Sequence, residues 1–185
     1  IKMMYETGIP IRTMCLSGHR KYPLGSNDEQ KIGRGMEIME KALQFADDLG
    51  IRIIQLAGYD VYYEKGSKET RERFRRNLNR AVHMASSLGI VMGFETMETK
   101  FMNTVEKAMT YVKENESPYL NVYPDCGNIT NAAVESGKDV LDDIEIGRGH
   151  MVAMHLKETN PGIFRNMMYG QGHVQFDTII NKAWK

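Results

Sequence analysis

Three short apolar segments of this chain each end on a side chain that can bind a metal ion. Residues 90–95 (IVMGFE) end on Glu95, residues 120–125 (LNVYPD) on Asp125, and residues 151–155 (MVAMH) on His155. Two carboxylates and one imidazole suit a divalent cation such as Mn, Co, Zn or Mg better than a metal that prefers thiolates. Each residue taken alone could equally be a polar side chain where a strand reaches the surface. Their recurrence at the ends of successive segments predicts one shared metal site.

The three end residues would meet only if the segments are parallel strands of one sheet, whose carboxyl ends lie at a common edge. The intervening sequence supports this arrangement. Apolar residues recur at helical spacing in segments that end at Leu49 and Leu88, over residues 103–115 and over roughly residues 130–146. Each of the first two is followed at once by a glycine and an Ile-rich strand, which is how a helix turns back into a parallel sheet.

Five predicted strands alternate with these helices, at residues 11–16, 51–56, 90–95, 120–125 and 151–155. This alternation predicts an α/β fold with a parallel sheet, either doubly wound or closed as a (β/α)8 TIM barrel. Ligands at the ends of three successive strands favour the barrel. Because five strands cannot close it, we expect an incomplete barrel that lacks the first strands and the last strand, in a single domain over residues 1–185.

The composition is typical of a soluble globular protein, with 42% apolar and 26% charged residues. Lys and Arg together number 24, as do Asp and Glu, so the zero net charge argues against binding to nucleic acid or to an anionic membrane. No apolar run approaches the ~18 residues of a membrane span. Cys15 and Cys126 lack C-x-x-C spacing, which fits a reducing, cytoplasmic location.

Several motifs occur in an order that resembles one enzyme family. They are FETMETKFMN from Phe94, YPDCGN around Asp125, MHLKET around His155, the segment from Pro161-Gly162 to GQGHVQF at residues 170–176, and the loop SGHRKYPLGS at residues 17–26. The chain resembles, nearly end to end, the L-ribulose-5-phosphate (L-xylulose-5-phosphate) 3-epimerases. These enzymes, also labelled hexulose-6-phosphate isomerases, belong to the xylose isomerase-like TIM barrel superfamily.

The resemblance implies a divalent metal bound by a Glu, an Asp, a His and a second Glu, with the two Glu residues also moving protons. Glu95, Asp125 and His155 match the first three positions, and the fourth would lie beyond Lys185. Removing a proton beside a ketone creates an enediolate, whose charge a cation stabilises. Epimerisation needs a second group to return the proton from the opposite face, so the catalytic residue Glu95 is only one of the pair.

Recognition of the substrate phosphate is less well defined by the sequence. His19, Arg20 and Ser26 lie between a predicted strand and the next helix, and Gly170 and Gly172 offer a second loop rich in N–H groups. Without the resemblance, both loops are ordinary solvated loops. With it, His19 and Arg20 become candidate substrate contacts.

Lys157 lies two residues beyond His155, so it points to the same face of the predicted strand. It is a third candidate for substrate binding, and the alternative is a salt bridge at the rim of the barrel.

We therefore expect a metal-dependent isomerase that epimerises a ketopentose 5-phosphate, L-xylulose 5-phosphate or L-ribulose 5-phosphate, at C3. Its expected partners are a small sugar phosphate and a second copy of the chain in a homodimer. The alternatives are an aldose-ketose isomerase, an epimerase of unphosphorylated ketoses, or a non-catalytic fragment that associates through its open strand edges. A nuclease on the same barrel would need a basic DNA track, which a net charge of zero does not offer.

Overall fold

The first two strands pair in parallel, and the sheet grows from them in sequence order. In the computed structural model, which describes residues 1–184, β1 (Thr13–Leu16) pairs with β2 (Ile53–Ala57) from Thr13 opposite Ile53 to Leu16 opposite Leu56. With β3 (Val91–Glu95) and β4 (Leu120–Tyr123), the sheet has the order β1-β2-β3-β4. In a doubly wound sheet, the spatial order of the strands reverses at a switch point. Strands that lie side by side in the order of the sequence are typical of a (β/α)8 barrel.

The chain divides into two compact units. Unit 1 comprises residues 1–92 and 117–120, and unit 2 comprises residues 93–116 and 121–185. The single domain predicted over the whole chain stays a prediction.

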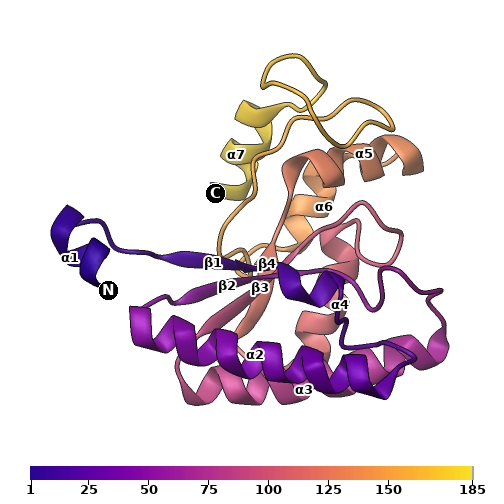
Figure 1. Cartoon of the computed structure of the whole chain (residues 1–185). Coiled ribbons are helices and arrows are strands. Elements are labelled where there is room, and N and C mark those ends of the chain that lie inside the picture. Colours follow the sequence, from indigo (N-terminus) through magenta and orange to yellow (C-terminus); the bar gives the residue numbers. More distant parts are fainter. Residues whose placement is uncertain (185) are drawn as a thin grey trace. The chain divides into compact units, whose positions relative to one another are not determined.

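Unit 1 contains α1 (Lys2–Thr7), β1, the 3-10 helix η1 (Ser17–Arg20), α2 (Glu29–Leu49), β2 and α3 (Lys68–Ser87). Helices α2 and α3 run side by side on one face of β1 and β2 (Figure 1). Their inward positions, Leu43 and Leu78, are buried together with Ile54 of β2. Gly50 and Gly89 follow the two helices with φ of 71° and 65°, as predicted for helices that turn back into a sheet.

Unit 2 contains the end of β3, α4 (Val105–Asn115), most of β4, α5 (Cys126–Ser136), α6 (Val140–Ile146) and α7 (Phe176–Trp184). Helix α6 packs against both α4 and α7. The carboxylate of Asp143 in α6 accepts hydrogen bonds from the first N–H groups of α4, those of Val105 and Glu106, at 2.8 and 2.9 Å. This cap ties the two helices together.

The predicted helix over residues 130–146 is wrong in its extent. Two helices occupy this region, α5 and α6. Helix α5 begins directly after Asp125 and ends at Gly137, whose φ of 65° suits a residue without a side chain. The chain then starts again with Asp139 as the N-cap of α6, its side chain accepting a hydrogen bond from Leu141 N.

The fifth predicted strand, residues 151–155, is also corrected. It runs parallel to β4, but only through isolated bridges between Val122 and Met151 and between Asp125 and His155. Pro124 has no N–H, which interrupts the ladder. From the first bridge to the second, the chain moves three residues on one side, from Val122 to Asp125, and four residues on the other, from Met151 to His155. The extra residue is a bulge, and it places His155 opposite Asp125.

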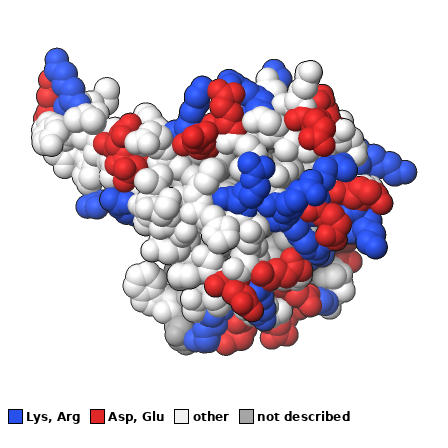
Figure 2. All heavy atoms as spheres, turned by 90° about the horizontal axis from the view of Figure 1, so that it is seen from below, with Lys and Arg blue, Asp and Glu red and all other residues white. Residues whose placement is uncertain are grey.

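The face shown in Figure 2 carries interspersed basic and acidic side chains, consistent with a formal net charge of zero. Among the helices that the structure describes, none combines the length and apolar character needed to cross a membrane.

Close packing inside unit 2 brings β3, which carries Glu95, near the segment that carries His155. A Cβ added to Gly93 of β3 would lie 2.7 Å from Val152 Cγ2 and 3.1 Å from Tyr123 Cβ. The missing side chain at residue 93 therefore sets how closely β3, β4 and residues 151–155 approach.

We predict that Gly93→Ala lowers the free energy of unfolding by about 1–3 kcal/mol, because the new methyl group overpacks this contact. Chemical denaturation measures the change. Gly33→Ala is the matched control: position 33 lies in α2 with no atom within 4 Å of the added Cβ, so alanine should stabilise by up to about 1 kcal/mol. Equal effects at both positions would contradict the packing argument.

Candidate metal centre

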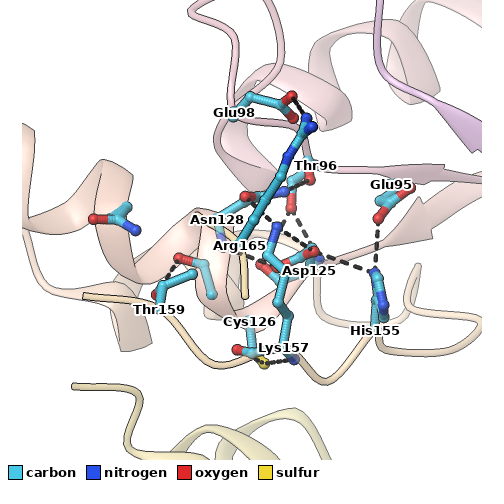
Figure 3. Close-up of polar contacts among 12 residues, drawn as sticks. Glu95, Thr96, Glu98, Asp125, Cys126, Asn128, His155, Lys157, Thr159 and Arg165 are labelled. Atoms are coloured by element: carbon cyan, nitrogen blue, oxygen red, sulfur yellow. Dashed lines mark hydrogen bonds and ion pairs between the residues drawn. The ribbon is translucent and has the colours of Figure 1, made fainter. Parts of the chain in front are cut away.

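The three predicted ligands lie together at one end of their strands. One ligand atom each from Glu95, Asp125 and His155 can be chosen so that all lie within 4.8 Å of one another. His155 Nδ1 is 2.7 Å from Glu95 Oε1 and 3.2 Å from Asp125 Oδ2 (Figure 3). Glu95 ends β3, Asp125 is the N-cap of α5, and His155 follows the bulge. Their role as metal ligands stays a prediction.

Asp125 is held by its surroundings so that one oxygen faces the other two ligands. Its side chain is completely buried. Oδ1 accepts a hydrogen bond from Asn128 N at 2.9 Å, as the side chain of an N-cap does. The backbone N–H of Asp125 donates to Thr96 Oγ1 at 2.9 Å. Within residues 1–184, no donor reaches Oδ2 in hydrogen-bonding geometry, although two cationic side chains lie near it. A buried carboxylate oxygen without a hydrogen bond fits a site for a cation.

Opposite charges balance one another around this oxygen. The carboxylates of Asp125 and Glu95 raise the pKa of His155 to about 10, against the opposing effect of burial. The imidazole is therefore protonated at neutral pH. Lys157 Nζ lies 3.0 Å from Asp125 Oδ2. Two positive side chains thus face two negative ones.

The adjacent thiol does not belong to the ligand set. Cys126 is fully buried, and burial raises the pKa of its thiol to about 11, so it is protonated at neutral pH. Its Sγ instead accepts a hydrogen bond from Lys157 N at 3.2 Å. The remaining donor set of two carboxylates and one imidazole suits a divalent cation of the Mn, Zn, Co or Mg type.

Two supporting residues, Thr96 and Asn128, were not predicted from the sequence. Asn128 is 1% exposed and uses its whole side chain, since Nδ2 donates to Thr96 O at 2.8 Å and Oδ1 accepts from Lys157 Nζ at 2.7 Å. It therefore connects the residue after Glu95, the start of α5 and the segment after His155. An asparagine near a helix start has no distinctive sequence pattern, so only the fold reveals this role.

Lys157 lies beside the ligand group, as its position in the sequence predicted. Its contacts to Asp125 and Asn128 place the ammonium at the centre rather than at an outer rim (Figure 3). Its role in substrate binding stays a prediction.

His19 and Arg20 lie in unit 1, and both have partners there. His19 is 6% exposed and its Nε2 lies 3.0 Å from Gly35 O. Burial lowers the pKa of His19, so the imidazole is neutral and brings no positive charge. Arg20 donates to Tyr59 Oη at 3.3 Å, and its guanidinium lies 5.0 Å from the ring centre of Tyr62. Their roles as substrate contacts stay predictions.

The first predicted anion loop already holds a carboxylate of the chain. Glu64 accepts hydrogen bonds from Ser26 Oγ at 2.6 Å, Asn27 N at 2.8 Å and Lys31 Nζ at 3.1 Å. Burial raises the pKa of Glu64, but these donors outweigh it and the net shift is downward. The hydroxyl of Ser26, which lies in this loop, is therefore already bound to Glu64.

The second predicted anion loop holds Glu158 in the same way. The Glu158 carboxylate is 3% exposed and accepts hydrogen bonds from Thr159 N, Gly170 N and Val174 N at 2.9–3.2 Å. A Cβ on Gly172 would clash with the backbone oxygen of Thr159 and with Glu158 Oε1, so only glycine fits at this position. The N–H groups of this loop are thus already bound by a carboxylate of the chain.

An ion pair joins the same loop to the strand end that carries Glu95. Arg165 Nη2 donates to Glu98 Oε1 at 2.7 Å, and Arg165 extends along the side of the centre in Figure 3. Glu98 therefore links this loop to the segment that follows β3.

Comparison with known proteins places these features in a family. The family model described as Xylose isomerase-like TIM barrel matches residues 1–183. L-ribulose-5-phosphate 3-epimerase UlaE of Escherichia coli O1:K1 / APEC is 45% identical over 177 residues, which are 96% of this chain and 61% of that protein. The chain thus spans about three fifths of the length of this curated relative.

Solved structures show the same fold at low sequence identity. The apo form of 3-keto-D-glucoside 4-epimerase YcjR from E. coli aligns with a TM-score of 0.79 and 17% identity, over 98% of this chain and 69% of that chain. L-ribulose 3-epimerase aligns with a TM-score of 0.76 and 18% identity, over 98% and 60%. These likenesses confirm the TIM barrel predicted from the sequence.

We predict that Mn²⁺ binding at pH 7 releases close to one proton. A ligating imidazole nitrogen carries no proton, whereas the raised pKa of His155, about 10, keeps the imidazole protonated beforehand. The apparent affinity should therefore rise about tenfold per pH unit below that pKa. Calorimetry in two buffers of different ionisation enthalpy counts the proton. Binding without proton release would mean that His155 is not a ligand.

We also predict that Glu158→Gln loosens residues 159–175. An amide NH₂ cannot accept, so at least one backbone N–H loses its partner, at a cost of about 1–3 kcal/mol. Amide hydrogen exchange at residues 170–174 should accelerate, with the exposed Glu135→Gln as control. The N–H groups hold the pKa of Glu158 below its usual value despite burial, so acidification through that pKa should loosen the same amides. Unchanged exchange would remove this role from Glu158.

Proposed function

We propose, because this chain belongs to the xylose isomerase-like TIM barrel family, that it acts as a metal-dependent isomerase of sugar phosphates. The proposed reaction is epimerisation at C3 between L-ribulose 5-phosphate and L-xylulose 5-phosphate. The observation that carries the proposal is that ligand atoms of Glu95, Asp125 and His155 lie within 4.8 Å of one another at a buried carboxylate. The similarity to an L-ribulose-5-phosphate 3-epimerase supports the choice of substrate.

The ligands of the proposed cation are Glu95, Asp125 and His155. A divalent ion bound there would stabilise the negative charge that develops on the sugar oxygens when the C3 proton leaves. Thr96 and Asn128 hold Asp125 in place, so the chain itself preorganises the site before any ligand arrives.

Glu95 is the proposed proton-transfer group on one face of the sugar. Glu95 is 9% exposed, and it is the last residue of β3, so the pairing of this strand fixes its position. Inversion at C3 needs a second group on the opposite face. Among residues 1–184 we assign no such group, since Glu98 pairs with Arg165 and Glu158 is bound by backbone N–H groups.

Lys157 is proposed to contact the substrate oxygens, because its ammonium lies 3.0 Å from Asp125 Oδ2 and its side chain is 25% exposed. His19 and Arg20 remain proposed substrate contacts. The neutral His19 would act through hydrogen bonding, which leaves Arg20 as the positive charge of that pair.

A cytoplasmic location and a homodimer complete the proposal. The free thiols of Cys15 and Cys126 are compatible with a reducing compartment. Large exposed apolar side chains such as Tyr5 and Trp184, 85% and 90% exposed, suit a contact with a second copy. Analytical ultracentrifugation tests the dimer, and a strictly monomeric protein at high concentration would refute it.

We predict that the protein with Mn²⁺ interconverts the two pentulose phosphates and exchanges the C3 hydrogen with solvent deuterium. Glu95→Gln should lower the rate of exchange by about 10²–10⁴-fold, the usual contribution of a general base. Glu98→Gln, three residues away, should change it less than about tenfold. Mass spectrometry and NMR follow both exchange and product.

The products separate this proposal from its alternatives. Equal turnover of L-ribulose would indicate an epimerase of unphosphorylated ketoses, and an aldose product would indicate an aldose-ketose isomerase. Absence of any exchange with Mn²⁺ would favour a non-catalytic protein and reject the proposal.

A further inference from the structure

Lys157 is fixed at both ends beside the proposed metal site. Its ammonium lies 3.0 Å from Asp125 Oδ2 and donates to Asn128 Oδ1 at 2.7 Å. Its backbone N–H donates to Cys126 Sγ at 3.2 Å. A Cβ on Gly127 would lie 3.3 Å from Lys157 Cε and 2.7 Å from Lys157 O. The position of this side chain is therefore built into the start of α5.

The oxygen that Lys157 faces is the one that a metal ion needs. Asp125 Oδ1 is used by the N-cap hydrogen bond, which leaves Oδ2 as the oxygen directed at Glu95 and His155. Two cations that share one buried oxygen repel each other strongly, because the surroundings screen the charges poorly. The ammonium and a divalent cation therefore compete for Asp125.

We propose that Lys157 is a resident counter-ion of Asp125 that a divalent cation must displace from Oδ2. This inference rests on the metal site of the proposed function and adds a role for Lys157 before substrate arrives. In the absence of a cation, the ammonium compensates a carboxylate that would otherwise be buried with too little positive charge. When displaced, Lys157 keeps Asn128 Oδ1 as a partner and turns its remaining N–H donors toward the open side of the centre.

Two roles of Lys157, competition with the metal ion and structural support of the site, predict opposite effects of its removal on metal affinity. If Lys157 only supported the fold of the site, removing it would weaken metal binding or leave it unchanged. If it competes, removing its charge strengthens metal binding while it destabilises the metal-free protein. The two readings therefore differ in the sign of one measurement.

The test compares Mn²⁺ affinity in the wild-type protein, Lys157→Met and Lys157→Gln, by the EPR signal of free Mn²⁺. Met keeps the length of the side chain, and Gln keeps a hydrogen-bond donor without charge. Both should bind Mn²⁺ at least about tenfold more tightly. Lys138→Met is the control for net charge, since Lys138 is 67% exposed and pairs with Glu106, and its affinity should stay within about twofold.

Thermal unfolding gives a second readout that does not depend on turnover. The metal-free Lys157 variants should melt below the wild type, and saturating Mn²⁺ should raise their Tm by more than it raises the wild-type Tm. A variant that folds only with Mn²⁺ present would satisfy both expectations. Unchanged or weaker Mn²⁺ binding in both variants would overturn the inference while leaving the proposed function intact. If neither wild type nor variants bind Mn²⁺, the inference and the proposed metal site both fail.

Discussion

Asp125 sets the main electrostatic constraint in unit 2, because a fully buried carboxylate must be compensated. The fold meets this constraint with an N-cap hydrogen bond from Asn128, the protonated His155 and the ammonium of Lys157. Each of these groups also belongs to the candidate metal centre. The electrostatic support of the buried acid and the construction of the site are thus the same set of contacts.

The arrangement of the ligand-bearing strands was largely readable from the sequence. Each ligand ends an apolar segment, and the glycines after α2 and α3 mark the return of the chain to the sheet. The barrel fold and the closeness of Glu95, Asp125 and His155 follow from those patterns. The interrupted pairing of residues 151–155 was not predicted. Pro124 did indicate it, because a residue without an N–H cannot take part in an unbroken ladder.

Other features depend on distant contacts that a linear pattern does not show. A regular parallel register that starts from Val122 opposite Met151 would place Met154, not His155, opposite Asp125. Only the bulge brings the imidazole into the centre. The roles of Thr96 and Asn128 require that β3 and α5 be neighbours. The two anion loops were recognised by their N–H donors, but the acceptors that fill them, Glu64 and Glu158, come from elsewhere in the chain.

The backbone N–H groups around Glu158 form an anion-binding site whose anion is the Glu158 carboxylate, which is covalently part of the same chain. A tethered group acts at an effective concentration of roughly millimolar or higher. A dilute free anion such as inorganic phosphate therefore competes poorly for these N–H groups, which already donate to Glu158. The chain therefore fills a potential anion site with its own carboxylate, so the closure of this loop depends on the protonation state of Glu158 and not on a dissolved anion.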